Sequence, residues 1–329
     1  MIKPEKASRH YIKGNTSMEF SLILFNKLIA MMLMAAVGFT LVKLKLLKQE
    51  DSRVISILLV YVLQPCLIAR AFQIDLTPER VHGFVYGTIF AAVTILLSML
   101  LARLFMKPID LDAVDRSTII YANVGNLLLP LVSMALGDEM VFYCSSFQIP
   151  FNLLLWTHGY SIIKGDKTVN IKKLLANPNL IALYIGIILL VTRTTVPSVI
   201  DAAAKGFNDM VAASSMLLVG MVIAGIDIKT VFTYKKAYLI SFGRLLAIPI
   251  LSMLILFATG FLTRHPELRP VFMVVILGAG APSASSIVQI AVLHNKNAAK
   301  ASIYNVMTTL LCVITMPLII FIYQMMFPG

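Results

Sequence analysis

The chain has 329 residues, of which 59% are hydrophobic and 13% are charged, and its mean hydropathy is +0.87. Soluble domains carry about 25% charged residues, so this composition excludes an ordinary soluble globular protein. The net charge of +12 would suit a nucleic-acid-binding protein, but the lysines and arginines lie in short clusters between apolar runs. Such clusters are typical of membrane proteins oriented by their basic loops, and we therefore expect no nucleic-acid partner.

Long apolar runs predict about ten membrane spans. A helix needs about 20 apolar residues to cross a hydrocarbon core of roughly 30 Å, and the runs between charged or turn residues have this length. The predicted spans are 19–42, 54–74, 82–105, 117–136, 140–163, 178–196, 210–226, 237–261, 270–294 and 301–325. The sequence therefore predicts an all-α polytopic membrane protein with no sizeable soluble domain.

The loops between these spans alternate in their content of lysine and arginine. Basic loops lie near residues 43–53, 103–116, 164–173, 229–236 and 296–300, whereas the loops between them carry few such residues. Because cytoplasmic loops are enriched in Lys and Arg, we expect a multi-pass protein of the cell (inner) membrane with both termini outside the cytoplasm.

The N-terminal tail conflicts with this orientation. Residues 1–17 contain four basic side chains that would prefer the cytoplasm by the same rule, namely Lys3, Lys6, Arg9 and Lys13. We interpret the tail as a dispensable extension before Met18. A signal peptide over residues 1–40 is the alternative, although no small-residue cleavage site ends the apolar run.

The three cysteines do not form a metal-binding or disulfide pattern. Cys66, Cys144 and Cys312 lie inside apolar segments, with no CxxC spacing and no neighbouring histidine. Cysteines in such positions act as small hydrophobic side chains, so we predict no metal site.

Two of the predicted spans are interrupted by glycine and proline near their middles. The fourth reads STIIYANVGNLLLPLVSMALG, with Gly125 and Pro130, and the ninth reads VFMVVILGAGAPSASSIVQIAVLHN, with Gly278, Gly280 and Pro282. Proline removes a backbone donor and clashes with the preceding turn, so both helices are predicted to break or unwind there. A membrane tolerates the freed backbone groups only where they are buried in protein or line a wet cavity.

The paired breaks predict an interior site for an anion. A half-helix starting at Pro130 or Pro282 would direct unpaired N–H groups and a positive dipole end at that site. Because the breaks lie five spans apart, we predict a tail, 1–17, followed by two repeats of opposite orientation, 18–165 and 166–329. Inverted repeats with discontinuous helices occur in several secondary transporters. Ordinary glycine and proline kinks are the alternative.

Polar side chains beside the breaks are the candidate substrate ligands. Amides and hydroxyls can bind carboxylate oxygens or cap freed backbone groups, and both roles stay open for the asparagines and serines. Gln148 and Asn152 lie four residues apart and share one inward-facing side of a helix, whereas an interhelical hydrogen bond is the alternative for Gln289. The candidates are Asn123, Asn126, Gln148, Asn152, Ser283, Ser285, Ser286 and Gln289.

Charged side chains inside the predicted spans are few. Lys27 and Arg244 lie about two turns from their helix ends, where such side chains extend to the headgroups, so Arg244 is expected to reach the membrane surface. Gln64 and Pro65 predict a local kink, or part of the wall behind the site. No Asp or Glu lies in the middle of a span, and coupling to H+ or Na+ therefore stays open.

A membrane enzyme and a channel are the alternatives to a carrier. An enzyme would need paired aspartates, an HExxH zinc motif or a Ser/His/Asp set, and none lies at membrane depth. The GAGAP string lacks the full GxGxxG of a dinucleotide-binding loop, so no cofactor is predicted. No filter-like repeat appears, but a channel-like anion permease on the same fold stays an alternative.

Four stretches resemble the auxin efflux carrier family, which includes plant auxin exporters and bacterial permeases associated with malonate or malate. They are NVGNLLLPLV at 123–132, FQIPFNLLLWTHG at 147–159, NPNLIALYIGIILL at 177–190 and GAPSASSIVQIAVLHN at 280–295. The similarity extends over the membrane region from about Met18.

The resemblance implies ten helices in two inverted five-helix repeats, with proline crossovers in helices four and nine. Asn123 and Pro130 match the first crossover, and Pro282 matches the second. Helices 1, 2, 6 and 7 would form a scaffold and the contact of a homodimer. The predicted function is secondary active transport of small organic anions, such as malate, malonate or auxin-like acids, by alternating access beside the crossovers.

Overall fold

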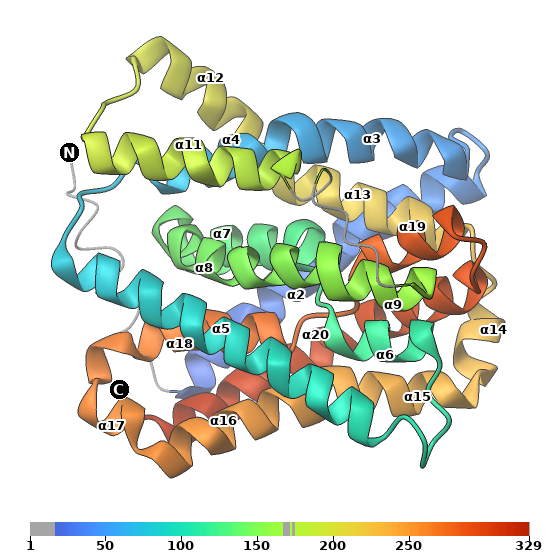
Figure 1. The fold of residues 1–329 in the computed structure, drawn as a ribbon. Helices are drawn as coiled ribbons and strands as arrows, with labels where there is room; N and C mark the ends of the chain where they lie inside the picture. The colour runs from blue at the N-terminus through green and yellow to red at the C-terminus, as the bar shows by residue number, and fades with distance from the viewer. Residues whose placement is uncertain (1–16, 167–171, 173–174, 329) are drawn as a thin grey trace.

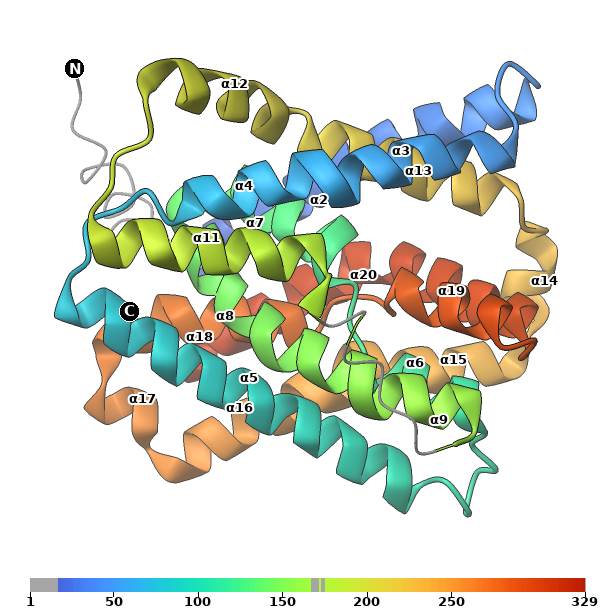
Figure 2. The same ribbon diagram turned by 45° about the horizontal axis from the view of Figure 1, so that its top comes forward.

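The computed structural model describes residues 17–166, 172 and 175–328. Within these residues the chain is helical and forms no β-strand, apart from one isolated bridge between two short extended stretches. The axes of most of the long helices are roughly aligned, and these helices extend from one end of the molecule toward the other (Figures 1 and 2). Residues 1–16 of the predicted tail lie outside the described residues.

Six helical segments of the described chain are long and apolar enough to cross a membrane. Each exceeds the roughly 20 residues that a crossing requires. They are Phe20–Lys43 in α2 (Ser17–Lys43), Gln49–Ala71 with α3 (Ser52–Leu58) and α4 (Gln64–Ala71), Pro78–Leu104 (α5), Ser198–Ala224 with α12 (Ser198–Asp209) and α13 (Val211–Ala224), Lys235–Thr259 with α15 (Lys235–Phe242) and α16 (Ile248–Thr259), and Ala298–Met326 (α20). The chain is a polytopic helical membrane protein, as the sequence predicts.

The other four predicted spans form shorter or bent helices. The fourth is divided into α6 (Ala113–Ile120) and Val124–Leu136, which contains α7 (Leu129–Leu136), and the ninth into α18 (Arg269–Ala279) and α19 (Ser285–Leu293). The sixth is α11 (Pro178–Thr192), and the fifth joins α8 (Asp138–Leu154), a π-helical turn (Leu155–Gly159) and α9 (Tyr160–Lys164). The divided pieces are each too short to cross a membrane alone, so the number of ten crossings stays a prediction.

Two predicted spans differ in their bounds from the helices that form. The helix predicted over 178–196 ends at Thr192, because Arg193 adopts a left-handed conformation with φ 53°. The span predicted over 210–226 begins earlier, at Ser198, because α12 continues into α13. α12 is amphipathic, so the residues of its polar face interrupt the apolar run from which the span was predicted. Two short helices, α14 (Ile228–Thr233) and α17 (Phe261–Arg264), connect longer ones.

Glycines allow α2 and α13 to approach closely. A Cβ added to Gly220 on α13 would lie 1.8 Å from the Ala35 carbonyl oxygen on α2, and a Cβ on Gly38 would lie 2.3 Å from the Leu217 carbonyl oxygen. Small residues let membrane helices approach until their backbones touch. The contact between α2 and α13 therefore depends on glycine at both positions.

We expect Gly220→Ala to lower the stability of the protein strongly. The added methyl group overlaps backbone atoms that cannot rotate away, and overpacking of this kind costs about 1–3 kcal/mol or more. The measurement is the thermal unfolding midpoint of the purified protein in detergent. Gly206→Ala on α12 is the matched control, since a Cβ there meets nothing within 4 Å; an equal loss in both variants would contradict this account of the helix contact.

A buried carboxylate joins the ends of α6, α15 and α20. The Asp115 side chain is 0% exposed and accepts hydrogen bonds from Lys236 Nζ at 2.8 Å, Lys300 Nζ at 2.9 Å and the Tyr304 hydroxyl at 2.7 Å. Burial alone would raise the pKa of Asp115, but the hydrogen bonds from these three donors hold it below its usual range. The carboxylate is therefore ionised at neutral pH and fixes the three helix ends to one another.

Candidate functional site

The fourth and ninth predicted spans break at the same place in the molecule and pair there. Residues 121–123 follow α6 and residues 280–284 follow α18; we call these two segments, which meet at an antiparallel bridge, the crossover. The Asn123 N–H donates to the Pro282 carbonyl at 2.7 Å, and the Ala284 N–H donates to the Tyr121 carbonyl at 2.9 Å. Each break therefore satisfies backbone groups that the other leaves open.

The prediction that half-helices start at Pro130 and Pro282 is wrong. The first begins at Val124 with a π-helical turn, Val124–Leu128, and Pro130 lies further along, in α7. The second begins at Ser285, and Pro282 lies in the extended segment before it. Pro130 fits inside a helix because the wide π turn before it already interrupts the regular ladder of hydrogen bonds.

The side chain of Asn123 connects the two half-helices. Its Oδ1 accepts a hydrogen bond from the Asn126 N–H at 3.2 Å, and its Nδ2 donates to Ser285 Oγ at 3.3 Å. The first N–H groups of a helix have no partner within that helix. In the described part of the chain, no carbonyl of the crossover accepts from the N–H groups of Ser285 or Ser286, so both groups are available to a ligand.

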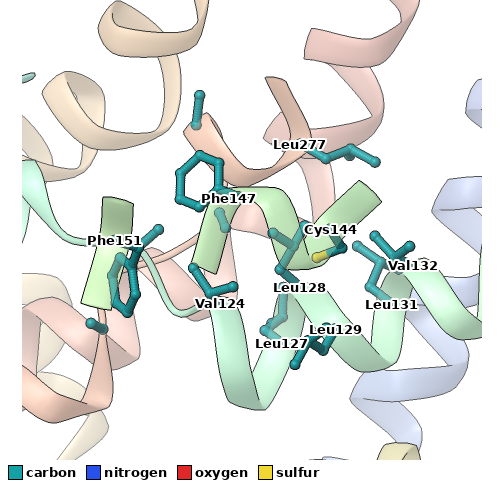
Figure 3. Packing of buried hydrophobic residues seen from close by; sticks show 14 of the residues in the cluster. Val124, Leu127, Leu128, Leu129, Leu131, Val132, Cys144, Phe147, Phe151 and Leu277 are labelled. Carbon is teal, nitrogen blue, oxygen red and sulfur yellow. The ribbon is translucent and has the colours of Figure 1, made fainter. Parts of the chain in front are cut away.

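Apolar packing holds the first half-helix in place. Figure 3 shows Leu128 and Phe147 in the buried cluster that α7 and α8 form with the end of α18, near Leu277. A Cβ on Gly278 would lie 2.9 Å from the Phe147 ring and 3.2 Å from Leu128. The close approach of α18 to this cluster therefore requires glycine at position 278.

The two other glycines predicted at the breaks are under less steric demand. A Cβ on Gly125 would lie 3.2 Å from Gln64 Oε1, which is tight. A Cβ on Gly280 would meet nothing closer than 3.6 Å, which is ordinary contact. Gly125 thus keeps space for Gln64, whereas packing alone does not explain Gly280.

Helix α20 supports the second segment of the crossover through its backbone. The Ser283 N–H donates to Thr308 Oγ1 at 3.1 Å, and the Ser283 carbonyl accepts from Asn305 Nδ2 at 2.6 Å. The Ser283 side chain is buried, and it is absent from the lining of the cavity described below. The structure therefore does not place Ser283 with the other candidate ligands.

Arg244 lies behind the crossover, in the π-helical turn Gly243–Ala247 between α15 and α16. It donates to the carbonyls of Ala281 at 2.9 Å and Gly278 at 3.0 Å, and to those of Ile119 at 3.2 Å and Ile120 at 3.3 Å. The expectation that Arg244 extends to the membrane surface is wrong, because its side chain is buried and turns inward to carbonyls at and just after the ends of α6 and α18.

A cavity of about 150 Å³ lies against the crossover. Its wall is formed by the crossover, the half-helix starts, α3 and α4, the end of α8, and the start of α11. None of the lining residues carries a charged side chain; they are Ser56, Val60, Gln64, Ala122, Asn123, Val124, Gly125, Asn126, Gln148, Phe151, Asn152, Leu155, Trp156, Asn177, Asn179, Ala284, Ser285, Ser286 and Gln289. The cavity is therefore rich in amides and neutral.

A chain of amide hydrogen bonds fixes part of this wall. Gln64 Nε2 donates to Asn126 Oδ1 at 3.0 Å, and Gln64 Oε1 accepts from Asn179 Nδ2 at 2.9 Å. Asn177 Nδ2 donates to Asn152 Oδ1 at 3.0 Å. Asn126 and Asn152 are thus engaged by protein partners, and Gln64 is part of the cavity wall, which was one of its two predicted roles.

Gln148 differs from these amides. Its side chain lines the cavity and is 3% exposed, yet its Nε2 has no hydrogen-bond partner within the described part of the chain. An unsatisfied buried amide donor costs about 1–3 kcal/mol, which is recovered when an acceptor binds. Gln148 therefore offers a donor to an oxygen atom inside the cavity.

The exposed part of the cavity wall lies toward the end of the molecule that carries the basic loops. Ser56, Asn177 and Asn179 are partly exposed and Gln289 is exposed, and all four lie near helix ends that adjoin those loops. Figures 1 and 2 show this end on the right, where α9, α14 and α19 lie, and the other end on the left, at α12 and α17.

The other end of the molecule is closed by polar contacts around Arg70. Arg70 at the end of α4 pairs with Asp201 on α12 at 2.8 Å and with Asp138 at the start of α8 at 3.8 Å. Asn208 on α12 donates to the same Asp138 at 3.1 Å. These contacts join α4 and α12 to α8 on the side away from the cavity mouth.

Of the candidate ligands predicted from sequence, the structure brings seven to one cavity and leaves Ser283 outside it. Residues that the sequence argument did not select also line the cavity, notably Asn177, Asn179, Phe151 and Trp156. Asn177 caps the start of α11, so an Asn-Pro-Asn sequence at a helix start was the available signal for this part of the wall.

Comparison with known families agrees with the architecture. A family profile described as membrane transport protein matches residues 23–320, which is most of the chain. No curated protein shows a significant match.

Proposed function

Since the chain belongs to the membrane transport protein family, the auxin efflux carrier family that its motifs resemble, we propose that it is a secondary active transporter of small organic anions. The proposed substrates are carboxylates, such as malate, malonate or auxin-like acids. The substrate would bind in the cavity beside the crossover and cross the membrane by alternating access.

One observation carries this proposal: two half-helices start at the wall of a single neutral cavity. The N-terminal end of a helix attracts anions through its free N–H groups and its dipole. Ser285 and Ser286 supply such N–H groups, and Gln148 supplies an amide donor to the same cavity. A carboxylate would satisfy donors that are otherwise left open.

The helix contacts support two inverted repeats, 18–165 and 166–329. The first helix of the first repeat, α2, packs on α13 of the second, and the first helix of the second repeat, α11, packs on α4 of the first. Likewise α7 packs on α8, and α19 packs on α20. A two-fold relation between the repeats would produce such reciprocal pairs.

We infer that this conformation is an inward-facing state. The basic loops would lie in the cytoplasm, and both termini would lie outside the cytoplasm. The mouth of the cavity adjoins the basic loops, and the Arg70 contacts close the opposite end. Closure at one end suits a carrier better than a continuous pore. A coupling ion, H+ or Na+, and a homodimer formed through the first two helices of each repeat remain part of the proposal.

Flux measurements test the transport cycle. In proteoliposomes containing the purified protein, uptake of a radiolabelled carboxylate should saturate with concentration and should accelerate when unlabelled carboxylate is loaded inside. Gradients of sodium and of pH, imposed separately, identify the coupling ion. Uptake that follows the gradient without saturation would contradict a carrier and favour the channel-like alternative.

Gln148→Leu is expected to reduce the rate of uptake about tenfold or more. Leucine has a similar size but is apolar, so the substitution removes an amide donor of the cavity that has no hydrogen-bond partner among the described residues. A hydrogen bond to a charged acceptor contributes about 1.5–3 kcal/mol. Ser283→Ala is the matched control, because the Ser283 hydroxyl has no hydrogen-bond partner among the residues that the structure describes and does not line the cavity. Equal activity of the two variants would show that Gln148 does not bind the substrate.

A further inference from the structure

Arg244 is a buried cation beside the crossover that is not neutralised by an acid. Its side chain is 2% exposed, and its four hydrogen bonds all go to backbone carbonyls. Among the described residues Arg244 forms no ion pair, and Asp115, in the first turn of α6, is already held by Lys236 and Lys300. An isolated buried charge is strongly destabilising, so the buried Arg244 charge lowers the free energy of unfolding of the protein.

Three of the carbonyls that Arg244 holds, those of Ile119, Ile120 and Gly278, lie at the C-terminal ends of two half-helices, α6 and α18. The fourth, that of Ala281, lies just after α18. A helix carries about half a negative charge at its C-terminus and about half a positive charge at its N-terminus. The crossover brings two ends of each kind together, and their fields would largely cancel. The unit charge of Arg244 offsets the two negative ends, so about one positive charge remains at the starts of Val124–Leu136 and α19, beside the cavity.

We propose that Arg244 determines the charge specificity of the cavity, which it makes selective for ligands with a single negative charge without contacting them. Arg244 does not line the cavity, so it acts through the half-helix ends as a positioning and specificity-determining residue. The inference rests on the proposed anion site. A dianion would leave one charge uncompensated, and a dicarboxylate therefore binds in its singly protonated form.

Trp156 provides a probe of this charge that needs no knowledge of the substrate. It is the single tryptophan of the chain and it lines the cavity. Iodide, acrylamide and caesium ions quench tryptophan fluorescence on collision, and they differ in charge. The ratio of iodide quenching to acrylamide quenching in the purified protein therefore reports the electrostatic potential at the cavity.

Arg244→Gln should lower this ratio by on the order of tenfold and raise quenching by caesium. About three residues of extended chain, roughly 10 Å, separate the Ile120 carbonyl from Asn123 in the cavity wall. A unit charge at that distance from the cavity changes the local concentration of a monovalent ion by a factor of this size, at an effective dielectric constant of about 20. Arg244→Lys, which keeps the charge but cannot hold four carbonyls, should lose thermal stability and keep the high ratio. If the role of Arg244 is purely structural, the iodide-to-acrylamide ratio should instead fall whenever thermal stability falls, and Arg244→Lys should then lose the high ratio.

Arg264→Gln is the matched control for loss of a helix-capping arginine. Arg264 also donates to carbonyls near a helix end, those of Thr259 and Gly260, but it is exposed and lies far from the cavity. Its removal should leave the ratio unchanged. Equal ratios in Arg244→Gln and wild-type protein would overturn the proposal.

The experiment stays decisive if Arg244→Gln does not fold. In the wild-type protein, iodide should quench Trp156 several-fold more strongly than caesium when the quenching by each ion is divided by its quenching of free N-acetyltryptophanamide. Equal normalised quenching by the two ions would overturn the proposal. Because quenching measures potential and not flux, a protein that transports nothing can still confirm the role of Arg244. If Arg244→Gln instead transports the anion and its Trp156 quenching equals that of the wild type, the proposed role of Arg244 is wrong and the proposed transport function stands.

Discussion

Replacing Asn123 by aspartate should abolish transport of organic anions and leave the protein folded. Asp caps a helix as well as Asn does, so the start of the half-helix at Val124 retains its cap. The new carboxylate, however, faces the cavity beside the N–H groups of Ser285 and Ser286, where it repels an anion and competes for the same donors. We expect uptake to fall at least a hundredfold, since like charges at this range cost about 3–4 kcal/mol at an effective dielectric constant near 20.

Asn123→Ser separates the effect of charge from the loss of the amide. Serine also caps helices and introduces no charge, so this variant should keep measurable uptake with weaker binding. Both variants are measured for uptake in proteoliposomes and for thermal midpoint. Retention of wild-type uptake by Asn123→Asp would show that the anion does not bind beside Asn123.

Asp115→Asn should produce the largest loss of stability among single substitutions outside the cavity. The change removes the negative charge that Lys236 and Lys300 share, and breaking a buried ion pair by removing one partner costs about 3–5 kcal/mol. The comparison is Asp209→Asn, which breaks an exposed pair with Lys205 on α12; such surface pairs contribute about 0.2–1 kcal/mol. Thermal midpoints measured at neutral pH distinguish the two sites.

The pH dependence of stability gives an independent check on Asp115. Because its pKa in the folded protein lies below the usual range, the stabilisation is fully present above the ordinary Asp value of about 3.9 and disappears as the pH falls through the lower value of the folded state. The gap in thermal midpoint between wild type and Asp115→Asn should therefore be constant from pH 5 to 8 and narrow only in stronger acid. A gap that closes near pH 6 would contradict an ionised Asp115.

The sequence predicted that the two broken spans form a site, but it misplaced the starts of the half-helices. The presence of proline and glycine in both spans correctly indicated discontinuous helices. Where each helix stops, however, depends on a partner distant in sequence, because the backbone of Asn123 pairs with Pro282 and that of Ala284 pairs with Tyr121. Proline chemistry alone acts locally and could not reveal that pairing.

The position of the Arg244 side chain also could not be predicted from the sequence near it. Its distance from the helix end suggested a side chain that reaches the headgroups, which is the usual behaviour of a lone arginine. The carbonyls that bind it lie at and just after the ends of α6 and α18, where those helices stop at the crossover. The role of Arg244 follows from the tertiary structure and cannot be read from its own helix.

The most direct test of the central claim is a structure of the protein with a bound iodinated monocarboxylate, chosen from those that raise its thermal midpoint. We expect the carboxylate between Gln148 and the half-helix starts, within hydrogen-bonding distance of the Ser285 and Ser286 N–H groups, and the iodine atom inside the cavity. A carboxylate bound at a different place, with the cavity beside the crossover unoccupied, would contradict the account.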